Sequence, residues 1–174
     1  MGVVKQSIIV EDRFREIFNY LPNMKDDNLN EFPIIFDGGD ELELNAFLTT
    51  KQGGLRPYPL IWLVYPFKEI HTKKEVKLDS VTFILAVETN SEMLNKQRLD
   101  ETFKKILFPL LFNIRKAFEK ACIININDEY EIIKHPNYSS DENGEQLSSI
   151  ELWDALKVTF DCSINNSCLR PLKI

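Results

Sequence analysis

The side chains that could carry out chemistry are few, and they form no familiar catalytic or metal-binding pattern. The chain has two histidines, His71 and His135, each predicted to lie in a polar loop, and three cysteines, Cys122, Cys162 and Cys168. Their spacings do not include C-x-x-C or the other ligand spacings of zinc sites. We therefore expect no metal, no cofactor and dispensable thiols.

Carboxylates are numerous but unfocused. Asp37 and Asp40 flank a pair of glycines, which predicts a turn followed by a helix cap. Asp154 and Asp161 are predicted on opposite faces of one strand, where they cannot act as a pair. Neither double glycine precedes Lys-Ser or Lys-Thr, as a phosphate-binding loop requires. Because no nucleophile, base and orienting group come together, the sequence predicts a protein that is not an enzyme.

Charge and composition restrict the classes of partner. The 174 residues include 27 Asp and Glu against 21 Lys and Arg, a formal net charge of −6. Nucleic-acid binders usually carry a basic stripe, but the basic residues here cluster only as pairs among acidic or apolar neighbours, at 73–74, 104–105 and 115–116. We expect no direct sequence-specific binding of nucleic acid. The longest nearly apolar stretch, 106–112, is far shorter than the ~20 residues that span a bilayer, so we expect no contact with a membrane. We expect the protein to be synthesised in a cytoplasm.

Hydrophobic periodicity predicts a single α+β domain over residues 1–174. An apolar stripe from Val10 to Leu21 predicts an N-terminal helix that Pro22 ends. One antiparallel or mixed sheet, with this helix and a long helix packed on one face, is the expected arrangement. The other elements expected are strands at 32–36, 60–65, 80–87, 130–133 and 152–164, a short helix or a strand at 41–48, and the long helix at 95–121.

Two of these elements carry the clearest patterns. In the long helix, Phe108 and Phe112 lie off the main apolar stripe, and Pro109 should kink the helix or split it into two collinear pieces. The last strand alternates cleanly, with an apolar face on which Asp154 is the exception. Its other face begins with Trp153.

Two segments exceed the usual connection length of about 4–6 residues. The first is a charged arm at 67–79, predicted as a hairpin arm or a long loop; the second is an acidic loop at 134–149. We expect the arm itself to be unnecessary for folding, because only the packing of 60–65 against 81–87 should be needed for stability in this region. The charged arm and the surplus aromatics are candidate subunit contacts, with ordinary core packing as the alternative for the aromatics. The candidate residues are Phe67, Lys68, Glu69, His71, Lys73, Lys74, Phe108, Phe112 and Trp153.

The order of segments resembles a known family. An N-terminal helix, Tyr58-Pro-Leu-Ile-Trp-Leu63, the charged arm, Val81-Thr-Phe-Ile-Leu-Ala-Val87, a helix opening near Asn95-Lys-Gln-Arg98 and Leu152-Trp-Asp-Ala-Leu156 follow one another. This order, over residues 5–165, resembles tail terminator and related head–tail neck proteins of tailed bacteriophages.

The resemblance implies a non-enzymatic virion protein of the tail or neck, made in the host cytoplasm. Such subunits form homo-oligomeric rings of about six or twelve copies, because head-to-tail contacts can close on themselves. The ring would cap the tail tube and contact other neck and tail-tube proteins. A small cytoplasmic adaptor or immunity-type binding protein is the alternative function, and an enzyme with an unrecognised site is a third.

Overall fold

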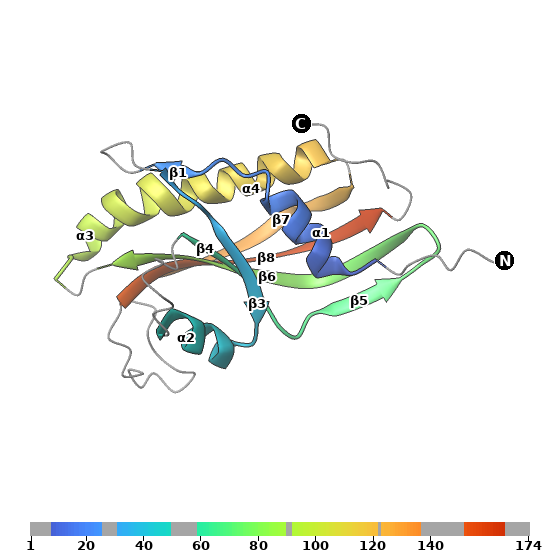
Figure 1. Ribbon diagram of the computed structural model, residues 1–174, viewed down its shortest axis with the longest axis horizontal. Coiled ribbons are helices and arrows are strands. Elements are labelled where there is room, and N and C mark those ends of the chain that lie inside the picture. Colours follow the sequence, from blue (N-terminus) through green and yellow to red (C-terminus); the bar gives the residue numbers. More distant parts are fainter. Residues whose placement is uncertain are drawn as a thin grey trace.

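The computed structural model describes residues 8–25, 31–49, 59–89, 92–121, 123–136 and 152–165. These residues form a mixed six-stranded sheet with helices packed on it, and a separate small ladder of β1 (Met24–Lys25) and β2 (Glu31–Phe32) (Figure 1). The predicted α+β fold with a mixed sheet is confirmed. Nearly all of the expected acidic loop lies outside the described residues.

The sheet is built around one long strand, β6 (Glu75–Thr89). One edge of β6 pairs with β8 (Leu152–Asn165) along its whole length. The other edge is shared, because β5 (Lys68–His71) pairs with its first part and β4 (Leu60–Val64) with its second. Two strands complete the sheet, β3 (Ile35–Gly39) parallel to β4 and β7 (Ile124–His135) antiparallel to β8.

A β-bulge divides β6 into these two parts. The pairing with β8 shifts between Leu78 and Val81, and Ser80 at this point has a φ of 56°, in the left-handed region. The Ser80 N–H donates to Asp161 Oδ1 at 2.7 Å, which ties the bulge to β8. Because the bulge adds a residue, Leu78 and Val81 are both buried on the same face although they are three apart.

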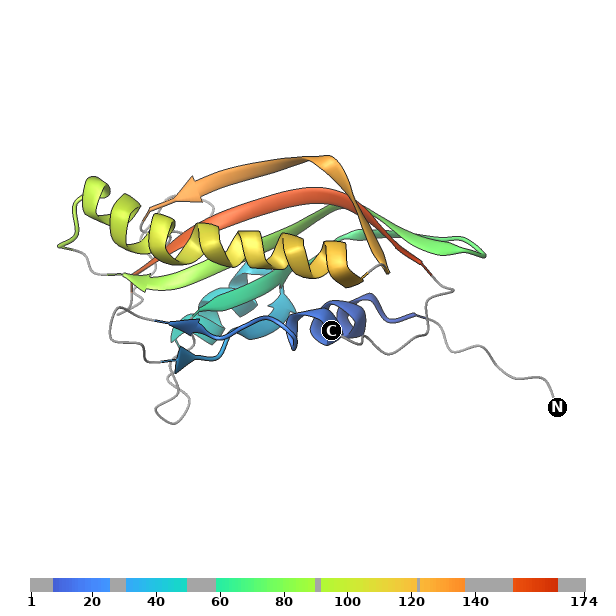
Figure 2. The same ribbon diagram turned by 90° about the horizontal axis from the view of Figure 1, so that it is seen from above.

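The larger core lies between one face of the sheet and the helices α1 (Val10–Phe18) and α4 (Phe108–Ala121), which cross it side by side (Figure 2). Its centre is aromatic: the Phe14 ring centroid lies 5.0 Å from that of Phe83 and 5.9 Å from that of Phe118. Phe160 of β8 stacks on Phe83 at 5.7 Å. The predicted stripe of the first helix is therefore the buried one, although α1 ends at Phe18, well before Pro22.

The long helix is continuous from Asn95 to Ala121 but changes geometry along its length. A turn of α3 (Asn95–Arg98) leads into a π-helical stretch, η1 (Leu99–Leu107), and then into α4. The change to α geometry falls at Phe108, whose N–H reaches back to the Phe103 carbonyl, immediately before Pro109. Pro109 lacks an N–H, and widened turns are one way that a helix accommodates a missing donor.

The opposite face of the sheet carries a second, smaller core under α2 (Glu41–Thr49). The N-terminal and long helices do share one face of the sheet, but the short helix lies on the other, so not all the helices pack on one face. Leu44 and Leu48 of α2 cover Trp62, Ile84 and Trp153. The alternative of a strand at 41–48 is also excluded: Asp40 Oδ1 accepts the Glu43 N–H at 2.8 Å, and Glu43 Oε2 accepts the Asp40 N–H at 3.0 Å, forming a capping box.

The double glycine at 38–39 is part of β3 and not the predicted turn. Gly39 is closely approached by two side chains: the Trp62 indole N–H donates to its carbonyl at 3.1 Å, and a Cβ at this position would collide with the Glu43 carboxylate and lie 3.0 Å from the Trp62 ring. A side chain here would have to move the Glu43 carboxylate, which caps α2, and would crowd the indole, so packing favours glycine.

Of the two forms predicted for the charged arm, a hairpin and a long loop, the structure shows the hairpin. Half of this hairpin, however, belongs to the core. Val76 and Leu78 in its second strand are each 1% exposed and pair with Ile164 and Cys162 of β8. The expectation that only 60–65 and 81–87 matter for stability here is therefore wrong. The strand predicted at 130–133 is also longer than expected, since β7 begins at Ile124 and includes Lys134 and His135.

Candidate functional site

The exposed half of the hairpin brings together most of the predicted interface residues. All four residues of β5 are exposed, and the turn that follows presents Lys73 and Lys74. Lys68 Nζ lies 3.2 Å from Asp79 Oδ2, and His71 Nε2 lies 2.6 Å from Glu69 Oε2. The turn is closed by the Thr72 hydroxyl, which donates to the Glu75 carbonyl at 2.9 Å. Both views show the hairpin protruding at one end of the sheet (Figures 1 and 2).

Phe67 anchors the base of this hairpin. It follows a cis Tyr65–Pro66 bond, is partly buried, and packs against Tyr65 with ring centroids 5.4 Å apart. The Tyr65 hydroxyl donates to Glu11 Oε1 at 2.9 Å. Burial, together with this carboxylate, raises the pKa of Tyr65 to about 12, so the hydroxyl keeps its proton and can donate to Glu11 at neutral pH.

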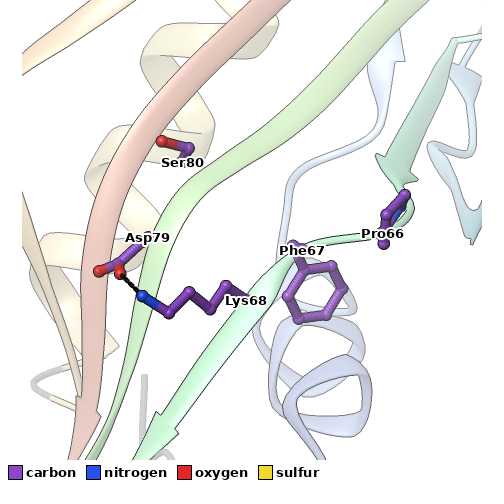
Figure 3. A pocket seen from close by; sticks show the side chains of 5 residues that line it. All are labelled: Pro66, Phe67, Lys68, Asp79 and Ser80. Carbon is purple, nitrogen blue, oxygen red and sulfur yellow. Dashed lines mark ion pairs between the residues drawn. The ribbon is translucent and has the colours of Figure 1, made fainter.

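An open hollow lies beside this base. Pro66, Phe67 and Lys68 line one side of it, and Asp79 and Ser80 the other (Figure 3). Lys68 reaches across to Asp79, so its charge is already paired. These lining residues include no histidine, and the two groups that could serve Ser80 as a base, Asp79 and Lys68, are paired with each other. The hollow therefore offers shape beside the hairpin and no assembled catalytic group.

A second group of predicted residues lies where α4 passes β7. Phe112 is 56% exposed, and Lys116 Nζ sits 4.2 Å from its ring centroid. Phe108 is partly buried, and Lys134 of β7 lies 5.1 Å from its ring centroid. The sequence analysis did not single out Arg115 and Tyr130, which form a third such contact at 4.6 Å with a hydrogen bond of 2.8 Å. The two phenylalanines therefore lie near one another on α4 and are not part of the hairpin.

Trp153 is not a surface residue of this chain. Its side chain is 1% exposed and lies in the smaller core beneath α2, because α2 covers the face of β8 on which Trp153 stands. Of the interface candidates, the structure thus places Lys68, Glu69, His71, Lys73 and Lys74 on the hairpin, Phe67 at its base, and Phe108 and Phe112 on α4. No protein-family model matches the chain, and no curated protein is significantly similar to it.

Within the described residues, the side chains suited to metal binding or nucleophilic chemistry do not converge; Cys122 and Cys168 lie outside those residues. His71 and His135 lie on β5 and β7, not in the loops where they were predicted. Burial and the Lys157 ammonium lower the pKa of His135, which favours its neutral form. Among the described residues, no three His, Cys, Asp or Glu side chains gather as a metal site.

Within the same part of the chain, no helix has the length and hydrophobicity to cross a membrane.

The sequence analysis missed a buried polar cluster at the opposite end of the sheet from the hairpin tip. Arg98 and Asp154 are 1% and 0% exposed, and the guanidinium Nη1 lies 2.9 Å from Asp154 Oδ1. The Thr102 hydroxyl lies 2.6 Å from Asp154 Oδ2, and Arg98 also donates to the Thr89 hydroxyl at 2.8 Å. Asp154 is the one acidic residue on the apolar face of β8, and this exception in the sequence was the signal that could have indicated a buried polar cluster.

Cys162 provides a test of the packing on β8. Its thiol is buried, which raises its pKa to about 12, and the thiolate is the reactive form. We expect iodoacetamide at pH 8 to leave Cys162 unmodified in the native protein and to modify it rapidly in urea, as measured by mass spectrometry of the cysteine-containing peptide. Equal rates in the two states would show that this face of β8 opens to solvent.

Proposed function

We propose that this protein is a virion assembly protein of a tailed bacteriophage, a tail terminator or neck ring subunit. In this proposal it acts without catalysis, by forming a homo-oligomeric ring that caps the tail tube and joins it to the head connector. The support from sequence is the order of segments; the support from structure is the exposed hairpin. A subunit that closes a ring needs two different surfaces, one that reaches out and one that receives, since head-to-tail contacts use distinct patches.

The hairpin supports the outreaching role better than any other part of the described surface. A free-standing hairpin would be marginal in water, but this one is held in place, because β6 is paired on both edges and buries Val76 and Leu78. The exposed strand β5 is thus presented on a rigid support. Such presentation lowers the entropy cost of binding a neighbour.

The first test is the mass and shape of the purified protein. We expect light scattering after size exclusion to give the mass of a closed ring, about six or twelve copies, and negative-stain images to show annuli. A monomer or a dimer over the whole accessible concentration range would contradict the ring proposal and favour the adaptor alternative.

The role of the arm is tested by reversing the charges of its turn. Lys73→Glu with Lys74→Glu changes exposed side chains only, so we expect thermal melting within about 2 °C of the parent and loss of the ring. The matched control is Lys96→Glu with Lys120→Glu, two exposed lysines on the helices, which should leave the ring intact. Full rings from the turn variant would exclude the turn from the subunit contact.

A further inference from the structure

Three strands of the described sheet, β3, β5 and β7, are each paired on one edge only, and β5 and β7 differ in the sign of their charge. Among the described residues, β5 is hydrogen-bonded to β6 alone and β7 to β8 alone, so each leaves one backbone edge without a strand partner. An edge of this kind is a template for pairing with another chain. Ring subunits that contact head to tail would use one edge of each kind.

The charges of the two edges are complementary. The segment 68–74, which is β5 and its turn, contains three lysines and one glutamate. The strand β7 contains three acidic residues and one lysine. All three acidic residues of β7 precede Ile132, so in antiparallel pairing of β5 with the end of β7 they lie on the side of the basic turn at 73–74. Opposite charges near one another favour this pairing between β5 and β7.

Strand direction is also compatible. From β5 through β6 and β8 to β7, each neighbouring pair is antiparallel, so β5 and β7 of one copy run in opposite directions. A second copy placed beside the first with its sheet in the same orientation therefore presents its β5 antiparallel to the first copy's β7. This arrangement continues the sheet without turning the subunit over.

We propose that β5 of one copy pairs with the end of β7, Ile132–His135, of the next copy, so that the sheet continues from subunit to subunit. The inference rests on the proposed ring and names its contact. Antiparallel pairing with Ile70 opposite Ile133 also brings Glu69 opposite Lys134. On the face away from α4, Ile70 is 39% and Ile133 is 42% exposed, and each would cover the other.

Sterics favour this register over the others. β4 lies in line with β5 along β6, and β3 pairs with the outer edge of β4 up to Val64, so a strand that pairs with the outer edge of β5 must end before it reaches β3. β7 ends at His135 and is followed by a turn at Pro136, and in this register His135 lies opposite Lys68. The remainder of β7 then extends past the hairpin tip, away from β3, and brings Glu129 opposite Lys74. A register that moves the end of β7 further along β4 is blocked by β3.

The test is charge reversal with compensation. Glu69→Lys and Lys134→Glu each place like charges opposite one another, so we expect each single variant to reduce the ring population at least tenfold by light scattering. Combined in one chain, the two changes restore opposite charges, and the double variant should form rings again. Glu119→Lys with Lys96→Glu, two exposed positions outside both strands, is the matched control and should behave as the parent. Full rings from the single variants, or failure of the double variant to recover while it melts like the parent, would overturn the inference.

A covalent trap gives an independent measurement. In a chain whose native Cys122, Cys162 and Cys168 are replaced by alanine, Ile70→Cys with Ile133→Cys should form a ladder of linked subunits on oxidation, while either cysteine introduced alone should not. Rings that form without this ladder would overturn the β5–β7 contact and leave the proposed function standing. Linked open filaments in place of rings would support the contact and contradict the ring function. A protein that stays monomeric and unlinked would overturn both.

Discussion

Replacing Asp154 with alanine should cost about 3–5 kcal/mol of folding stability, because it leaves the buried guanidinium of Arg98 without its carboxylate. Asp154 also accepts from the Thr102 hydroxyl, but that hydroxyl keeps the Arg98 carbonyl as an acceptor at 2.6 Å, so the expected loss comes from the guanidinium. Urea titration of the parent and of Asp154→Ala measures the difference, with an unchanged dependence on urea concentration as the check that unfolding remains two-state.

Two further variants separate burial from charge pairing. Asp100→Ala removes a partner from the exposed ion pair with Lys104 and should cost no more than about 1 kcal/mol. Arg98→Met with Asp154→Leu removes both buried charges, and we expect it to be more stable than either single variant. If Asp154→Ala costs no more than Asp100→Ala, water reaches the cluster and the network is not the closed one described.

Truncating Phe160 should have a comparable effect. The ring is 7% exposed and lies against Phe83 and Phe118, with centroids 5.7 and 6.0 Å away. Loss of a large core side chain removes transfer free energy and leaves a cavity, so Phe160→Ala should cost about 3–5 kcal/mol. For a chain of this size we expect a fall of roughly 6–20 °C in melting temperature.

Phe112→Ala is the matched control for Phe160→Ala, because the same side chain is removed from a site that is 56% exposed. It should melt within about 2 °C of the parent. A similarly small change for Phe160→Ala would mean that the apolar face of β8 is not the buried one.

The parts of the fold that were predictable are those whose pattern is local. Alternation along β8 gave both its faces, and the stripe in α1 gave its buried side, because each pattern is set by the period of one element. Segments governed by a distant partner were mispredicted. Gly39 was interpreted as part of a turn because nothing nearby in sequence indicates that Trp62 lies against it.

The same distinction applies to the candidate site. Polar residues of the arm were correctly placed together because they are consecutive in sequence. The burial of Trp153 could not be predicted from the sequence around it. It depends on α2, which is distant in sequence and meets β8 only in the folded protein. Only 130–133 of β7 was predicted as a strand; the rest was missed because its polar, weakly alternating sequence resembles a loop, and its strand conformation depends on pairing with β8.

The central position of β6 has a consequence for the order of folding. Its partner along the whole of one edge is β8, with Thr89 opposite Leu152 and Glu75 opposite Asn165, so the pairing joins positions more than sixty residues apart. Such distant pairings form late, because the chain entropy of closing the loop is lost before the contacts form. β7 in turn is held only by β8 among the described strands. During synthesis, therefore, β7 cannot take its place at the edge of the sheet until β8 has been made and has docked, although β7 precedes β8 in the chain.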